Sequence, residues 1–282
     1  MSSLSTSTIA RADRANPRWS LDSIDWSALR HDAVTGNDAI FYLIAAASFV
    51  EATTDLYTRT LIDYFAGDDE ITEWLETHWL PEELQHGRAL RRYVQLAWPD
   101  FDWDRVYEKF LPEYAAQCAN DGVEPTRSRE MASRCIVEMG TASYYRMLSR
   151  MTDEPVLTAV TQHIAEDEVS HYKHFYRYLR KYRSREGQRR GGIVRAAWNR
   201  LRMIDGADSR IAMRHIYHAR NPGRVFDDRV FRELRRGSKA LIQPHFPHRM
   251  CMQMLLKPLD LGPRTHRVVL PVVEAIARRI VP

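Results

Sequence analysis

Cysteine and long apolar runs are both scarce in this sequence. The three cysteines, Cys118, Cys135 and Cys251, are odd in number and form no Cys-x-x-Cys pair, which favours reduced thiols over a disulfide framework. The longest apolar stretch without a charge, residues 39–50, is too short to cross a membrane. Residues 1–20 lack the apolar core of a secretory signal. We therefore expect a cytoplasmic protein with no membrane span.

The pattern typical of β-strands, alternating apolar and polar residues between turn signals, is almost missing. Helical periodicity instead predicts five successive helices, over residues 38–65, 70–97, 104–120, 125–150 and 153–182. The charged, glycine-rich stretch 184–192 indicates a linker. We therefore expect an all-α protein.

Three segments follow from this division. Residues 1–36 are expected to form an N-terminal leader, flexible at its start, and residues 37–183 a helical domain. Residues 184–282 are expected to form a basic, mostly helical extension of irregular shape. Its helical periodicity is interrupted at residues 221–223, Pro244, Pro247 and Pro263.

Charge is divided unevenly along the chain. Residues 180–282 hold 24 Lys and Arg against 8 Asp and Glu, whereas residues 1–179 hold 17 against 29. A basic surface attracts acidic partners such as nucleic acid, an anionic membrane or an acidic carrier protein. An equally open interpretation is that the basic part packs against the acidic part of its own chain.

Two Glu-x-x-His motifs occur, Glu83–His86 and Glu168–His171. Residues three apart on a helix share a face, so each motif directs a carboxylate and an imidazole the same way. One such motif is expected by chance in a chain with this many Glu and His. The informative feature is a second spacing, because Glu51 lies 32 residues before Glu83 and Glu138 lies 30 residues before Glu168.

This repeat predicts two helical hairpins, each with one Glu and one Glu-x-x-His, that bring six ligands into a bundle core. The arrangement matches that of dinuclear iron and manganese carboxylate bundles. Carboxylate oxygens with one imidazole per metal suit iron or manganese. The candidate metal ligands are Glu51, Glu83, His86, Glu138, Glu168 and His171.

The surroundings of two candidates agree with burial. Glu51 follows the uncharged stretch 39–50, and Glu138 is the only charge between Arg134 and Arg146. A buried carboxylate without a cation costs several kcal/mol. The competing interpretation is that these acids occupy the solvent face of amphipathic helices.

Four segments are similar to motifs of one family. The segment 74–87 has a Trp-rich lead-in followed by Glu-Glu-x-x-His-Gly, and in 51–61 a Glu precedes a Tyr and a Thr-x-Leu-like run. Residues 138–141 read Glu-x-x-Thr, and residues 167–171 read Asp-Glu-x-x-His. This pattern resembles the ferritin-like di-iron carboxylate family, most of all the soluble acyl-carrier-protein desaturases. The likeness covers about residues 38–182 and implies a ferritin-like four-helix bundle with additional helices.

The resemblance also implies roles. Two iron ions, or manganese, would be bridged by Glu83 and Glu168. Terminal carboxylates would come from Glu51 and Glu138, with one imidazole each from His86 and His171. Thr141 would lie beside the oxygen-binding face and assist proton delivery, or would simply permit close helix packing. Asp167 would hydrogen-bond a ligand histidine and fix its tautomer, or would be a solvated helix acid.

We therefore expect an oxygen-activating di-iron oxidoreductase, most like an acyl-carrier-protein desaturase, that abstracts hydrogen from an acyl or related organic substrate. An external donor such as a ferredoxin would supply electrons. An acidic acyl carrier protein or a small molecule would be the partner, the chain would form a homodimer, and nucleic acid is not expected. Three alternatives stay open: a di-iron hydroxylase or N-oxygenase of a small metabolite, a non-enzymatic iron-storage protein, and a helical scaffold with a vestigial site whose basic tail binds nucleic acid or membrane.

Overall fold

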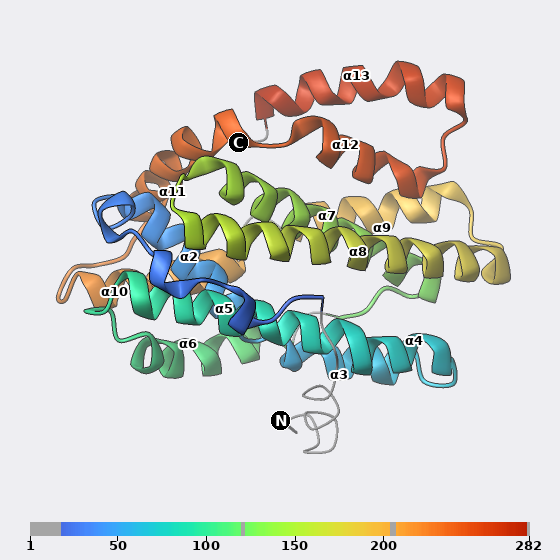
Figure 1. Cartoon of the computed structure of the whole chain (residues 1–282). Coiled ribbons are helices and arrows are strands. Elements are labelled where there is room, and N and C mark those ends of the chain that lie inside the picture. The colour runs from blue at the N-terminus through green and yellow to red at the C-terminus, as the bar shows by residue number, and fades with distance from the viewer. Residues whose placement is uncertain (1–17, 120–121, 204–206, 281–282) are drawn as a thin grey trace. The chain divides into compact units, whose positions relative to one another are not determined.

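The computed structural model describes residues 18–119, 122–203 and 207–280, and every regular element in those ranges is a helix (Figure 1). The all-α prediction is confirmed for that part of the chain. No single helix among the described residues has the length and apolar character needed to cross a membrane. Asp38–Glu51 (α2) and Asp55–Tyr64 (α3) reach both criteria only when combined, and they are bent by 43°.

Internal contacts divide the chain into two compact units. Unit 1 takes the described residues of Met1–Gly122, Asp153–Val160 and Gly206–Ser238; unit 2 takes those of Val123–Thr152, Thr161–Asp205 and Lys239–Pro282. Unit 1 contains α2, α3, α4 (Asp69–Trp74), α5 (Leu80–Ala97), α6 (Trp103–Cys118), α10 (Ala207–Arg220) and most of α11 (Asp228–Ile242). Unit 2 contains α7 (Arg127–Met151), most of α8 (Pro155–Glu186), α9 (Arg190–Met203), α12 (His248–Leu256) and α13 (Pro263–Ile280). Residues 184–282 therefore contribute helices to both units.

The core of unit 1 is built around α2, which packs along α5 and is also covered by α10. Phe41 and Phe49 of α2 are fully buried. Phe41 meets Trp98 edge to face at a centroid distance of 5.1 Å, and Phe49 meets Trp103 in the same way at 5.2 Å. A helix that is apolar on all sides is buried, and this places its last residue, Glu51, inside the unit.

The first predicted helix, residues 38–65, is broken, so its prediction as one element was wrong. Backbone N–H groups of Thr53 and Thr54 bond to the carbonyls of Val50 and Glu51, three residues back, instead of continuing the α-helical pattern. The Thr53 and Thr54 hydroxyls donate to the same two carbonyls, at 2.6 and 3.0 Å. Threonine side chains compete in this way with the helix for backbone acceptors, and the chain turns directly after Glu51.

The second predicted helix, residues 70–97, is observed as α4 and α5, joined by a π-helical turn at Leu75–Trp79. The backbone is therefore helical from Asp69 to Ala97. π-helical turns are rare insertions in α-helices and are frequent at functional sites. This one ends at Trp79, shortly before the candidate ligand Glu83.

Part of the expected leader is packed. Residues 1–17 lie outside the described residues, but 18–36 form three short 3-10 turns and bury Trp19, Ile24 and Val34. The Trp26 indole N–H donates to the Leu21 carbonyl at 2.8 Å. The segment therefore belongs to the core of unit 1 from Trp19 onward.

Side chains cap the starts of α7 and α8, where the sequence places helix starts at residues 125–126 and 153–155. The Thr126 hydroxyl accepts from the Arg129 N–H at 3.4 Å. The buried Glu154 carboxylate accepts from the N–H groups of Val156 and Leu157, at 3.2 and 2.7 Å. These caps satisfy N–H groups that have no partner inside the helix, so both predicted starts are confirmed.

The predicted linker at residues 184–192 was wrong over most of its length. Helix α8 continues to Glu186 and α9 begins at Arg190, leaving only residues 187–189 outside a helix. Gly187 has a φ of 60°, the left-handed conformation common just after a helix end. The Glu186 carboxylate accepts from the N–H groups of Arg127 and Ser128, at 3.0 and 3.1 Å. This tertiary contact stabilises the end of α8, although the charge of residues 184–192 favoured a linker.

Some basic residues of the C-terminal part pair with acids of the earlier part. In unit 1, Arg214 and His215 of α10 contact Glu113 of α6, the latter at 2.9 Å, and Arg220 pairs with Asp38 at 3.3 Å. Packing of the basic part on the acidic part is thus observed for these residues. These ion pairs involve only some of the basic residues in the C-terminal part.

Candidate metal centre

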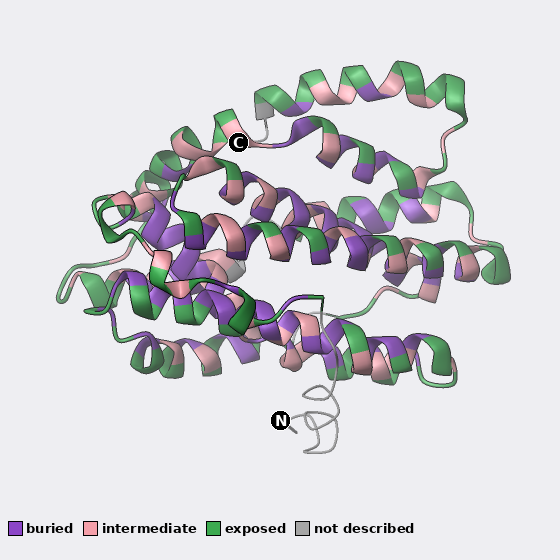
Figure 2. Ribbon diagram, in the orientation of Figure 1, coloured by how far each residue is buried: buried purple, intermediate pink, exposed green. Residues whose placement is uncertain are grey.

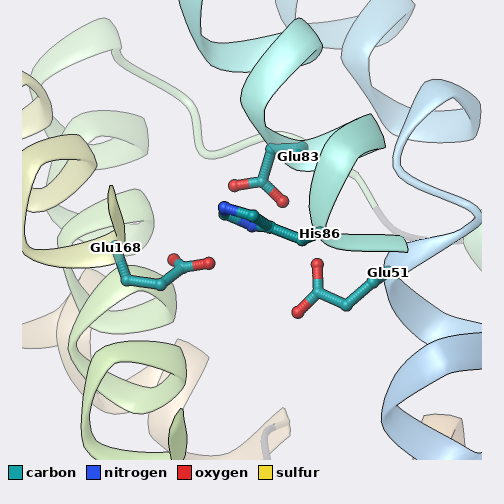
Figure 3. A group of neighbouring side chains, drawn as sticks. All are labelled: Glu51, Glu83, His86 and Glu168. Atoms are coloured by element: carbon teal, nitrogen blue, oxygen red, sulfur yellow. The ribbon is translucent and has the colours of Figure 1, made fainter. Parts of the chain in front are cut away.

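In unit 1 the three ligands predicted from the first repeat form a cluster. Glu51 is the last residue of α2, and Glu83 and His86 lie one turn apart on α5. One ligand atom from each residue lies within 4.8 Å of the others. The exposed fractions are 8% for Glu51, 5% for Glu83 and 0% for His86. Figure 3 shows the two carboxylates and the imidazole directed toward a common space.

A close approach of two backbones holds this cluster together. A Cβ atom at Gly87 would lie 2.9 Å from the N and Cα atoms of Ala52 and 3.0 Å from the carbonyl carbon of Glu51. Real Cβ contacts are not this short, so α5 can approach the end of α2 only because residue 87 is glycine. The Ala52 carbonyl also accepts from the Tyr107 hydroxyl at 2.8 Å. The helix break, the glycine and α6 together position Glu51 beside the Glu-x-x-His pair.

The N-terminal segment covers the imidazole of this cluster. The Trp19 ring stacks on the His86 ring with a centroid distance of 6.4 Å and an interplanar angle of 10°. Gln85, at a variable position of the motif, donates from its amide to the Trp19 carbonyl at 2.9 Å. Trp19 is 6% exposed, so this contact is part of the core and shields one side of His86 from water.

The negative charge of the cluster affects the pKa of Tyr57, which lies on α3. The pKa of its enclosed hydroxyl is raised well above the ordinary value, first by burial and then by the carboxylates of Glu83 and Glu51. The Tyr57 ring also lies 5.9 Å from that of Trp79. Like charges nearby disfavour a further negative charge, so the tyrosine is held in its neutral form.

In unit 2 the ligands predicted from the second repeat form a matching cluster. Glu138 lies on α7, and Glu168 and His171 lie on α8; Glu168 is also labelled in Figure 3. The His171 Nδ1 atom is 3.6 Å from a carboxylate oxygen of Glu138 and 3.9 Å from one of Glu168. One ligand atom from each lies within 4.8 Å of the others, and each residue is 1% exposed. Both predicted three-residue sets are therefore brought together.

The two residues predicted to assist the ligands lie in unit 2. The Thr141 hydroxyl is 2.6 Å from a Glu168 carboxylate oxygen, to which it donates, and 3.3 Å from the carbonyls of Val137 and Glu138. Asp167 is 1% exposed, so its interpretation as a solvated helix acid is wrong. Its hydrogen bond to a ligand histidine stays a prediction.

The donor atoms of these clusters fit a metal ion. Each cluster offers two carboxylates and one imidazole in a buried space, and carboxylates this close repel one another unless a proton or a cation lies between them. Hard oxygen donors with one nitrogen per cluster suit iron and manganese better than metals that prefer thiolate. The buried Glu and His groups could therefore coordinate metal, and the alternative of a solvent-facing acidic stripe was wrong.

Sequence reasoning missed the contribution of Trp19 and Gln85. The available signal was a tryptophan at the end of an otherwise polar leader, but nothing in its neighbourhood points to His86, which is far along the chain. The role of Gly87 as a spacer was equally hidden, because only the approach of Ala52 requires it.

Comparisons with protein-family models, with curated proteins and with solved structures find no match to this chain.

Proposed function

We propose that the two clusters together bind a pair of iron ions and that the chain is an oxygen-activating oxidoreductase with a ferritin-like four-helix bundle at its centre. One observation carries the proposal: each copy of the Glu and Glu-x-x-His repeat folds into a buried set of two carboxylates and one imidazole. Two such sets supply the ligands of a dinuclear carboxylate site. The two copies of the repeat follow one another along the chain, each on two helices, and this order supports a single bundle core.

In this proposal the residues divide by position in the repeat. Glu51, Glu83, His86, Glu138, Glu168 and His171 would hold the ions. From the resemblance, Glu83 and Glu168 would be the shared carboxylates, Glu51 and Glu138 would each serve one ion, and each histidine would bind one ion. When bound, a ferrous pair would supply two electrons for the reduction of dioxygen, and the residues named above would hold it in place. The site must be dry for such chemistry, and the stacking of Trp19 on His86 supports the exclusion of water on the unit 1 side.

Thr141 has a defined part in the proposal. Its hydroxyl donates to a Glu168 carboxylate oxygen at 2.6 Å, so it holds a proton at that oxygen, and this proton would be available for the reduction of dioxygen. Thr141→Val keeps the shape and removes the hydroxyl, whereas Thr141→Ser keeps the hydroxyl. We expect Thr141→Val to slow oxygen consumption by about tenfold or more with unchanged iron content, and Thr141→Ser to remain near the parent. Equal rates in both variants would assign Thr141 to packing alone.

The proposed substrate is an acyl chain, on the basis of the resemblance of residues 74–87, 138–141 and 167–171 to the acyl-carrier-protein desaturases. An acidic acyl carrier protein would also be attracted by the positive charge of residues 180–282. The test is to load the full chain with ferrous iron, add a reductant and stearoyl carrier protein, admit oxygen and identify the product by mass spectrometry.

Each product has a distinct meaning. A new double bond supports desaturation, and an added oxygen atom supports the oxygenase alternative. Accumulation of ferric iron without an organic product supports iron storage. Glu166 is exposed and lies on the same helix as Glu168, so Glu166→Ala is the matched control for Glu168→Ala. If the parent and Glu168→Ala consume oxygen at the same rate, the proposed function is wrong.

A further inference from the structure

Large apolar side chains are exposed mainly on two helices of unit 2. Within the described residues nine such side chains are exposed, and six of them lie on α9 and α13, namely Val194, Trp198, Met203, Val268, Val272 and Ile276. Single exposed apolar residues are ordinary, but a contiguous group marks an interaction surface. The more regular group is the one on α13.

Three apolar residues form a continuous stripe along α13. Val268, Val272 and Ile276 follow one another at every fourth position, so they lie on one side of the helix. Their exposed fractions are 69%, 55% and 51%. Leu270 and Ala277 are buried, and the helix packs against α12, alongside which it lies in Figure 1. Figure 2 shows α13 with most of its length exposed.

Arginines stand at both ends of this stripe. Arg264 lies one helical turn before Val268, in the same row, and Arg279 lies three residues after Ile276. Arg264, Arg267 and Arg279 are exposed, and within the described residues none of them forms an ion pair with an acidic side chain. Glu274, the one acidic residue of α13, forms ion pairs with Arg278 at 2.8 Å and with Arg249 at 3.7 Å. The side of α13 that carries the stripe is therefore both apolar and positively charged.

We propose that α13 docks on an anionic lipid surface, with Val268, Val272 and Ile276 entering the headgroup boundary and the arginines contacting acidic headgroups. A helix with an apolar face and a basic polar face binds in this way, and each arginine near an anionic leaflet adds attraction. Nucleic acid explains the arginines but gains nothing from an aliphatic stripe, since its backbone contacts are electrostatic. A second copy that packed through the same face of α13 would bring like charges face to face. The lipid surface is the partner that uses both features.

The test is co-sedimentation of the full chain with vesicles of phosphatidylcholine alone and of equimolar phosphatidylcholine and phosphatidylserine. We expect binding to the anionic vesicles and little binding to the neutral ones. Val272→Ser with Ile276→Ser is expected to lower the partition coefficient by about tenfold or more. Arg264→Gln with Arg267→Gln is expected to lower it by about thirtyfold.

Matched controls make the outcomes decisive. Val225 is 75% exposed in unit 1, so Val225→Ser removes an exposed apolar side chain elsewhere and is expected to leave binding unchanged. Because all of these positions are exposed, the variants are expected to keep the parent circular dichroism spectrum and melting temperature. The proposal is overturned by any of three results: no binding to anionic vesicles, binding that depends on the arginines but not on the stripe, or a stripe variant that changes the oligomeric state instead of vesicle binding.

Discussion

Replacing Gly87 with alanine tests how unit 1 assembles its cluster. The new Cβ atom would lie 2.9 Å from two backbone atoms of Ala52, at least about 0.5 Å short of an ordinary contact. Both neighbours are backbone, so relief requires the end of α2 and α5 to separate. Overpacking of this kind costs about 1–3 kcal/mol, while alanine gains about 1 kcal/mol over glycine in helix propensity. We therefore expect Gly87→Ala to lower the free energy of unfolding by up to about 2 kcal/mol.

Gly237 of α11 provides the matched control. It lies inside a helix of the same unit, is exposed, and a Cβ atom there meets nothing within 4 Å. Gly237→Ala should therefore show the propensity gain alone, a rise of about 1 kcal/mol. Urea denaturation of both variants measures the difference, expected to be about 1–3 kcal/mol. Equal changes in the unfolding free energy of the two variants would refute the close approach of α2 and α5. If Glu51 binds iron as proposed, Gly87→Ala should also lower the iron affinity, and an unaltered affinity would contradict that placement of Glu51.

Three further predictions concern packing, charge and thiol reactivity. Trp19→Ala is expected to lower the free energy of unfolding by about 3–5 kcal/mol, because it empties a buried ring site; a change below about 1 kcal/mol in urea denaturation would show that this ring is not packed. Glu113→Gln should destabilise the chain at neutral pH but not in acid. Arg214 holds the pKa of Glu113 below its ordinary value, so the pair contributes stability above that ordinary value and loses it as the pH falls through the lowered one. Melting curves across this pH range check it, and a difference independent of pH would argue against the pair. Iodoacetamide at mildly alkaline pH should modify Cys118 before Cys135, because burial raises the pKa of the Cys135 thiol well above its ordinary value. Mass spectrometry measures the order, and simultaneous labelling would contradict the burial.

The local features of the fold could be predicted from the sequence. The Glu-x-x-His pairs share a helix face for any regular helix, so Glu83 and His86, like Glu168 and His171, were fixed as neighbours by spacing alone. Helix starts at Thr126 and Glu154 were readable because capping depends on adjacent residues. Glu51 and Glu138 were identified by a second spacing and an uncharged environment, and both are buried in their clusters.

The features that were missed depend on contacts between distant residues. The placement of Glu51 beside α5 depends on Gly87 and Tyr107, and the helical end of α8 at Glu186 is held by the start of α7. Burial of Trp19 depends on His86 and Gln85. Local propensity gives no information on such partners, and in the region 184–192 it favoured the wrong element because tertiary contacts override it.

The central claim, that both clusters serve one pair of iron ions, is tested most directly by iron content per chain. We expect about two irons in the parent and in the neighbouring controls Glu82→Ala and Glu166→Ala. If Glu83 and Glu168 bridge the ions, Glu83→Ala and Glu168→Ala should each lose both and retain well under one iron per chain. Retention of one iron in each variant would indicate two separate mononuclear sites. Retention of both irons in either variant would contradict the proposed ligand set.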